Sequence, residues 1–105
     1  MEKPNINYIQ ELSGGDVEFE QKILTILKTE LPEEIAHYKK AIKNQNFKES
    51  AQSVHKLKHK ISILGLENAY RFAEQYEKEL NSGIAAQHPS FLKILESMSQ
   101  FLAKN

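Results

Sequence analysis

The amino-acid sequence predicts an all-α protein, an antiparallel four-helix bundle with two additional short N-terminal helices. Three observations support this fold class. Apolar residues recur every three or four positions along most of the chain, which is the period of an amphipathic helix. No segment shows the pattern of a strand. The 4 glycines and 3 prolines divide the chain into segments of helical length joined by short links, which favour antiparallel packing.

The two N-terminal helices are predicted from the signals at their ends. Pro4 can open a short helix over residues 5–12. Gly14 can end it, because glycine accepts the left-handed backbone of a helix C-terminus. Asp16 is a suitable N-cap for a second helix over residues 17–30.

Pro32 is predicted to separate this second helix from a third. Proline has no backbone N–H, so we expect the helix to break or kink at this residue. Pro32-Glu33-Glu34 also suits a first helical turn, since proline is tolerated there and acidic side chains favour the positive helix end. The third helix is therefore expected over residues 33–44.

Helices over residues 47–64, 67–81 and 89–103 complete the predicted bundle. Gly65 permits a tight turn between the first two of them, and Pro89 is a favoured first residue of the last. The side chains expected in the core from these segments are Phe47, Ala51, Val54, Leu57, Ile61 and Leu64, then Leu66, Ala69, Ala73, Tyr76 and Leu80, then Phe91, Leu95, Met98 and Leu102.

Length and composition narrow the function classes. The 105 residues suit one domain, residues 1–105. The absence of cysteine excludes a disulfide scaffold, a cysteine zinc site and thiol catalysis. Residues 1–12 lack the apolar core of a signal peptide, and the uncharged run of residues 61–66 is too short to span a bilayer. We therefore expect a soluble, cytoplasmic protein without a membrane partner, and Met1 favours a free-standing protein over an excised domain.

The charges balance overall but are unevenly distributed. The chain has 14 basic and 14 acidic residues, which argues against nucleic-acid binding. Residues 39–60, however, contain seven lysines and one acidic residue, Glu49, leaving a local charge of +6. A solvated lysine face and a docking surface for an acidic partner both explain this pattern, and both stay open.

The side chains that could take part in a reaction are concentrated in one predicted helix, between residues 54 and 62. Residues three, four and seven positions apart share a helix face, so the sequence predicts that four polar side chains line up on the outside: His55, Lys58, His59 and Ser62. Neutral imidazole is a nucleophile near pH 7, because its unperturbed pKa is about 6.5. An exposed ammonium group on Lys58 could neutralise a phosphoryl group or another anion held at His55.

This segment resembles the signature of histidine phosphotransfer domains. His55-Lys56-Leu57-Lys58 is followed by Ile63-Leu64-Gly65-Leu66, where the family has His-x-Leu-Lys-Gly, a few small or apolar residues, and Leu-Gly-Ala. The run Leu12-Ser13-Gly14-Gly15-Asp16, with Glu18 and Phe19 after it, is similar to the family's N-terminal segment, and Leu31-Pro32 also fits. The resemblance covers nearly the whole chain.

The resemblance implies a carrier of phosphoryl groups, and not an enzyme. Its phosphorylated histidine corresponds to His55 and its neighbouring lysine to Lys58. The implied partners are response-regulator receiver domains or a hybrid histidine kinase, which supply the aspartate and the divalent metal, so no cofactor is expected. This fits a chain without a Gly-rich phosphate loop or clustered aspartates. A monomer is expected.

His59 departs from the family, which usually has glycine at this position. The imidazole could narrow the approach of a receiver and select partners, or it could donate to the phosphoryl oxygens. Ser62, one turn further on, is expected to contact the phosphoryl group or the receiver. The departure also keeps open a second function, a helical adaptor that docks receivers or other proteins without being phosphorylated.

Further assignments concern the remaining polar side chains. If the helices on either side of Gly65 form a hairpin, Gln75 or Glu77 lies opposite His55 and can hydrogen-bond its Nδ1. Zinc between His55 and His59 lacks a third ligand, so no metal site is expected. The other two histidines, His37 and His88, are expected to be surface or capping residues.

Overall fold

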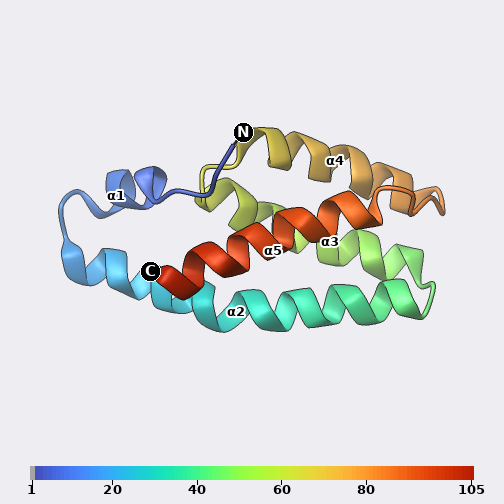
Figure 1. Cartoon of the computed structure of the whole chain (residues 1–105), viewed down its shortest axis with the longest axis horizontal. Coiled ribbons are helices and arrows are strands. Elements are labelled where there is room, and N and C mark those ends of the chain that lie inside the picture. The colour runs from blue at the N-terminus through green and yellow to red at the C-terminus, as the bar shows by residue number, and fades with distance from the viewer. Residues whose placement is uncertain (1) are drawn as a thin grey trace.

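Residues 2–105, which the computed structural model describes, form five helices and no strand: α1 (Asn7–Ser13), α2 (Val17–Lys43), α3 (Phe47–Ile63), α4 (Glu67–Asn81) and α5 (His88–Lys104). Met1, on which the expectation of a free-standing protein rests, lies outside the described residues. Helices α2 to α5 run along the long axis of a bundle that measures 44 × 24 × 19 Å, and α1 lies beside the N-terminal part of α2 (Figure 1). The predicted all-α class is confirmed.

The predicted break at Pro32 is wrong, because α2 runs without interruption from Val17 to Lys43. The bundle therefore has one additional N-terminal helix instead of two. Proline inside a helix costs about 3 kcal/mol. Here its ring lies on the exposed side, while the opposite stripe buries Leu24, Leu27, Leu31, Tyr38 and Ala41 on both sides of the proline. Burial of one large side chain contributes about 1.5–3 kcal/mol, so the stripe as a whole outweighs the proline.

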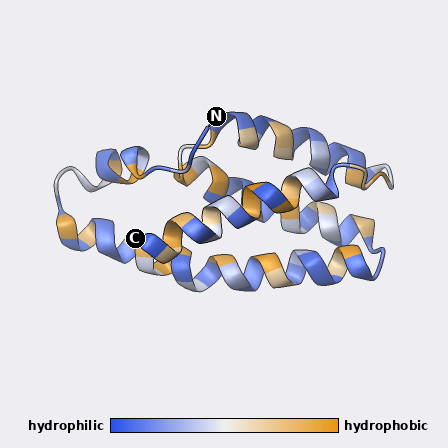
Figure 2. Cartoon of the chain, in the orientation of Figure 1, coloured by the Kyte–Doolittle hydropathy of each residue, from blue (hydrophilic) through white to orange (hydrophobic). Residues whose placement is uncertain are grey.

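The core is built from the apolar stripes of all five helices. Figure 2 shows apolar and polar residues alternating around each helix at the helical period. The predicted core residues of α3, α4 and α5 are buried, except Phe47, which is half-buried. Leu12 on α1 is 50% exposed, although the period groups it with buried Ile9. Within residues 2–105, no helix has the length and apolar content needed to cross a membrane.

Helices α3 and α4 form the hairpin that carries the candidate site. Asn46 begins α3 as its N-cap, and its side-chain oxygen accepts a hydrogen bond from the Glu49 backbone N–H over 3.1 Å. Gly65 connects the two helices with a φ of +75°, a conformation that favours glycine. The tight turn sets the two helices antiparallel, so residues near position 55 face residues near position 77.

The N-terminal segment is fastened across this turn. The Asn5 backbone N–H donates to the Leu64 carbonyl over 2.9 Å, and the Asn5 side chain lies so close to Gly65 that an added Cβ would stand 2.7 Å from it. The carboxylate of Glu2 accepts hydrogen bonds from the backbone N–H groups of Asn68 and Ala69 at the start of α4. Glu2 thus supplies the cap that α4 lacks in its own sequence.

Candidate functional site

His55 lies in the middle of α3 on the side that faces α4, and 57% of its side chain is exposed. Its Nδ1 stands 3.2 Å from Oε2 and 3.4 Å from Oε1 of Glu77 on α4. An ionised carboxylate can only accept a hydrogen bond, so this contact calls for the ring proton on Nδ1. Nε2 of the neutral ring then carries the lone pair, on the side of the imidazole away from Glu77.

Lys58 is not exposed as the helical face predicts, and this expectation is corrected. Its side chain is 11% exposed, and its Nζ donates to Oε1 of Glu77 over 2.9 Å. The ammonium also stands 5.6 Å from the centre of the Tyr70 ring. Burial by itself would lower the pKa of Lys58, but the hydrogen bond and charge of Glu77 outweigh it and the pKa is raised. Lys58 is buried because α4 packs against this side of α3 and encloses the lysine side chain.

Glu77 therefore connects two basic groups that lie one turn apart on α3. One carboxylate contacts both the half-exposed His55 and the buried Lys58. Gln75, the other residue expected to orient His55, donates instead to Oε2 of Glu79 over 3.3 Å. The hairpin places Glu77 rather than Gln75 against the imidazole, because the helical rotation between the two positions turns Gln75 outward.

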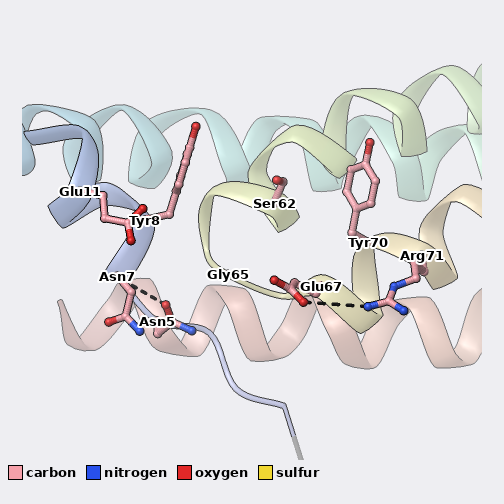
Figure 3. Close-up of a pocket in the computed structure, with 9 residues that line it drawn as sticks. All are labelled: Asn5, Asn7, Tyr8, Glu11, Ser62, Gly65, Glu67, Tyr70 and Arg71. Carbon is pink, nitrogen blue, oxygen red and sulfur yellow. Dashed lines mark hydrogen bonds and ion pairs between the residues drawn. The ribbon is translucent and has the colours of Figure 1, made fainter.

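His59 and Ser62 are exposed on α3, as the helical face predicts. The His59 ring meets the His55 ring edge to face, with 5.5 Å between their centres. Ser62 lines a cavity of about 600 Å³ whose other wall is formed by the N-terminal segment and α1, including Tyr8 (Figure 3). Figure 3 shows Tyr8, Ser62 and Tyr70 pointing to the same side of the molecule.

A smaller cavity of about 330 Å³ flanks His55 on its other side. It is lined by Ala51, Gln52, His55, Lys56, Glu77 and Asn81. Lys56, the residue after His55, is exposed.

The lysine-rich stretch is less solvated than its composition suggests. Lys60 is 10% exposed on the opposite side of α3, and its Nζ donates to Glu30 over 2.9 Å and to Glu34 over 2.6 Å, both on α2. Its pKa is raised, since these hydrogen bonds outweigh the effect of burial. Two of the lysines between residues 39 and 60 are therefore internal ion-pair partners. The spacing of Glu30 and Glu34, one helical turn apart, was the signal in the sequence that could have indicated a shared partner.

A second buried polar group involves His88, which is not a simple surface or capping residue as expected. The Tyr38 hydroxyl lies 2.7 Å from Nδ1 of His88 and 2.6 Å from the hydroxyl of Tyr76. Burial, with a smaller effect of Lys39, lowers the pKa of His88. Tyr38 on α2 and Tyr76 on α4 belong to the core, whereas His88 at the start of α5 is half-buried. His37 is a surface residue whose Nε2 pairs with Glu49 at 3.0 Å.

No group of three or more histidine, cysteine, aspartate or glutamate side chains within residues 2–105 is arranged to hold a metal ion. Comparison with curated proteins and with solved structures gave no match. The scan of family models matches the Hpt domain over residues 22–104, about four fifths of the chain. Domains of this family serve in histidine phosphotransfer within phosphorelays, and the matched range contains α3, α4 and α5 whole. This match, together with the helical bundle, shows that the chain belongs to the Hpt domain family.

Proposed function

We propose that the protein is a phosphorelay carrier, which accepts a phosphoryl group on Nε2 of His55 from the aspartate of one receiver domain and passes it to another. The observation that carries this proposal is the His55 side chain itself. It is exposed in the middle of α3, with Nδ1 against a carboxylate and Nε2 left as the nucleophile. The whole chain is proposed to act as one such domain.

The proposed transfer needs few groups from this chain. The Nε2 lone pair attacks the phosphorus atom of the receiver's aspartyl phosphate, the P–O bond to the aspartate breaks, and the carboxylate leaves with the electron pair. Transfer to the next receiver reverses these steps, with an aspartate oxygen as nucleophile and the imidazole nitrogen as leaving group. Phosphoryl transfer depends mainly on positioning and charge stabilisation. We propose that the receiver supplies the divalent cation and that this chain supplies an oriented imidazole.

Glu77 is proposed to orient that imidazole. Its contact with Nδ1 favours the tautomer in which Nε2 is free to attack. The Nδ1 proton remains available to Glu77 after phosphorylation, because the phosphoryl group occupies only Nε2. The same contact can thus hold the ring in both states of the carrier.

Transfer to His55 is tested with a panel of receiver domains that carry a radiolabelled aspartyl phosphate. We expect the label to move to this protein, to resist alkali and to be lost in acid, as a phosphoramidate requires. His55→Gln should abolish labelling while the helical circular dichroism signal is kept. His37→Gln, on the exposed surface of α2, is the matched control and should label normally. Labelling of His55→Gln together with loss of label in His59→Gln would mean that His59 is the phosphorylated residue.

His59 is proposed to act as a steric filter for receivers. It stands next to His55 on the exposed face, so its ring lies in the path of any domain that reaches Nε2. His59→Gly should leave transfer from the cognate receiver equal or faster and raise transfer from foreign receivers. If His59 donates to the phosphoryl oxygens instead, the same substitution slows cognate transfer.

The bulk of His59 beside His55 also supports a second candidate, an adaptor that docks receivers without being phosphorylated. The labelling experiment separates the two functions when binding is measured in parallel. A receiver that binds with its usual affinity and never transfers its phosphoryl group would favour the adaptor. Transfer that depends on His55 rules it out.

A further inference from the structure

We infer that Lys58 is a positioning residue, which acts on phosphoryl transfer by holding the Glu77 carboxylate against Nδ1 of His55. This inference rests on the proposed function of His55. It assigns Lys58 a place beneath the reacting imidazole, in contrast to the direct contact with the phosphoryl group that the expected exposure of Lys58 suggests.

The surroundings of Lys58 keep its ammonium group away from the exposed face. The side chain is 11% exposed, against 57% for His55 one turn earlier. Its Nζ is held at 2.9 Å by Glu77 and lies near the Tyr70 ring. To reach a phosphoryl group on Nε2, Lys58 would have to break this ion pair. Glu77, which is 22% exposed, would then be left partly buried without its cation.

The distances show which of the two contacts anchors the carboxylate. The Lys58–Glu77 contact, at 2.9 Å, has the length of a strong charge-assisted hydrogen bond. The contacts of Glu77 with Nδ1 of His55, at 3.2 and 3.4 Å, are longer and weaker. Without Lys58, the Glu77 side chain would lose conformational entropy to form the weak contact with His55 alone. The ion pair with Lys58 already orders the carboxylate, so the contact with His55 costs little further entropy.

This arrangement makes the effect of Lys58 depend on Glu77. Without Lys58, the carboxylate is free to turn to solvent, and the neutral ring gains access to the tautomer with its proton on Nε2, which cannot attack phosphorus. If Glu77 is already replaced by glutamine, the charged anchor is gone and removing Lys58 changes little more. If Lys58 instead touched the phosphoryl group, its removal would slow transfer by the same factor whether residue 77 is glutamate or glutamine.

The test is a double-mutant cycle with Lys58→Met, Glu77→Gln and the double variant. Transfer from a phosphorylated receiver is measured for each. We expect Lys58→Met to slow transfer roughly tenfold in the native background, the scale of losing an orienting partner, and less than about twofold in the Glu77→Gln background. Lys58→Arg, which can keep the ion pair, should recover most of the rate. Equal slowing by Lys58→Met in both backgrounds would overturn the inference.

The second measurement reads the imidazole directly and does not need a receiver. The ¹⁵N chemical shifts of the His55 ring, taken at alkaline pH where histidines are neutral, report which nitrogen carries the proton. We expect the Nδ1–H form in the native protein and a mixture of tautomers in Lys58→Met. Lys60→Met is the matched control, because it removes a lysine of similar burial from the other side of α3 and should leave the His55 shifts unchanged.

The double-mutant cycle and the ring shifts together test the role of Lys58 separately from the carrier function. Unchanged tautomer populations in Lys58→Met would overturn the positioning role, whatever the transfer rates are. Failure of the native protein to accept a phosphoryl group would instead overturn the carrier function, and the ring shifts would still decide whether Lys58 positions Glu77 and His55.

Discussion

Lys58 and Lys60 stand two residues apart on α3, are equally buried, and have different surroundings. Lys58 faces α4, where one carboxylate, Glu77, serves two basic side chains. Lys60 faces α2, where two carboxylates, Glu30 and Glu34, converge on one ammonium group. The α4 side thus shares its acidic group with an exposed imidazole, whereas on the α2 side both carboxylates contact the same lysine.

One helix can thus support both packing and chemistry. Lys60, held by two carboxylates of α2, fixes α2 against α3. A single carboxylate with two partners forms one strong and one weak contact, and the weak one reaches a side chain that is open to a partner protein. We therefore expect loss of Lys60 to act mainly on stability and loss of Lys58 to act mainly on transfer.

The largest effect on stability is expected for Lys60→Met. This change leaves two carboxylates near each other without a cation between them, Glu34 at 22% exposure and Glu30 at 53%. Removing one partner of a fully buried ion pair costs about 3 kcal/mol or more. Solvent screening at Glu30 reduces this cost, so we expect the free energy of unfolding in urea to fall by about 2 kcal/mol. Phosphoryl transfer per folded molecule should stay unchanged. A loss below about 1 kcal/mol would place this pair among ordinary surface salt bridges.

The pH dependence of the stability difference between the native protein and Lys60→Met tests whether an ion pair causes that difference. The pKa of Lys60 is raised above its usual 10.5 in the fold, so the folded protein holds this proton more tightly than the unfolded chain. Its contribution is fully present below pH 10.5 and is lost as the pH rises through the raised pKa. The stability difference between the native protein and Lys60→Met should therefore narrow above pH 10.5. A constant difference across this range, in urea unfolding at several pH values, would contradict an electrostatic origin.

A smaller loss of stability is expected for Lys58→Met, about 1 kcal/mol. One carboxylate is left without its cation here instead of two, and Glu77, which is 22% exposed, is free to turn to solvent at the edge of the bundle. Urea unfolding of both lysine variants under one set of conditions measures the contrast. If Lys58→Met proves as destabilising as Lys60→Met, the two sides of α3 contribute equally to stability.

The smallest effect is expected for Lys48→Ala. This variant tests whether Lys58 and Lys60 contribute to stability because they are buried and not because they lie on α3. Lys48 lies near the start of α3 and is exposed. Its substitution should change the free energy of unfolding by less than about 0.5 kcal/mol, as is usual for surface positions. A loss of more than about 1 kcal/mol would indicate that the lysine-rich stretch stabilises the bundle through its overall charge.

Most helices and most of the core could be predicted from the sequence, because they depend on local signals. The turn at Gly65, Pro89 at the start of the last helix and the apolar period were enough to place α3, α4 and α5 within about two residues of their observed ends. The same period put His55, His59 and Ser62 on the exposed face of one helix. These features follow from backbone geometry, which neighbouring residues fix.

Which polar groups meet depends on the packing of the helices. The helix period put Lys58 outside, yet α4 encloses it. The spacing of Glu30 and Glu34 indicates a shared partner, but nothing local identifies it as Lys60, which lies 30 and 26 positions away. Pro32 signals a helix end locally, but the buried stripe on both sides of it holds α2 together. Packing between helices joins residues that are distant in the chain, and its free energy exceeds the local preferences that a sequence displays.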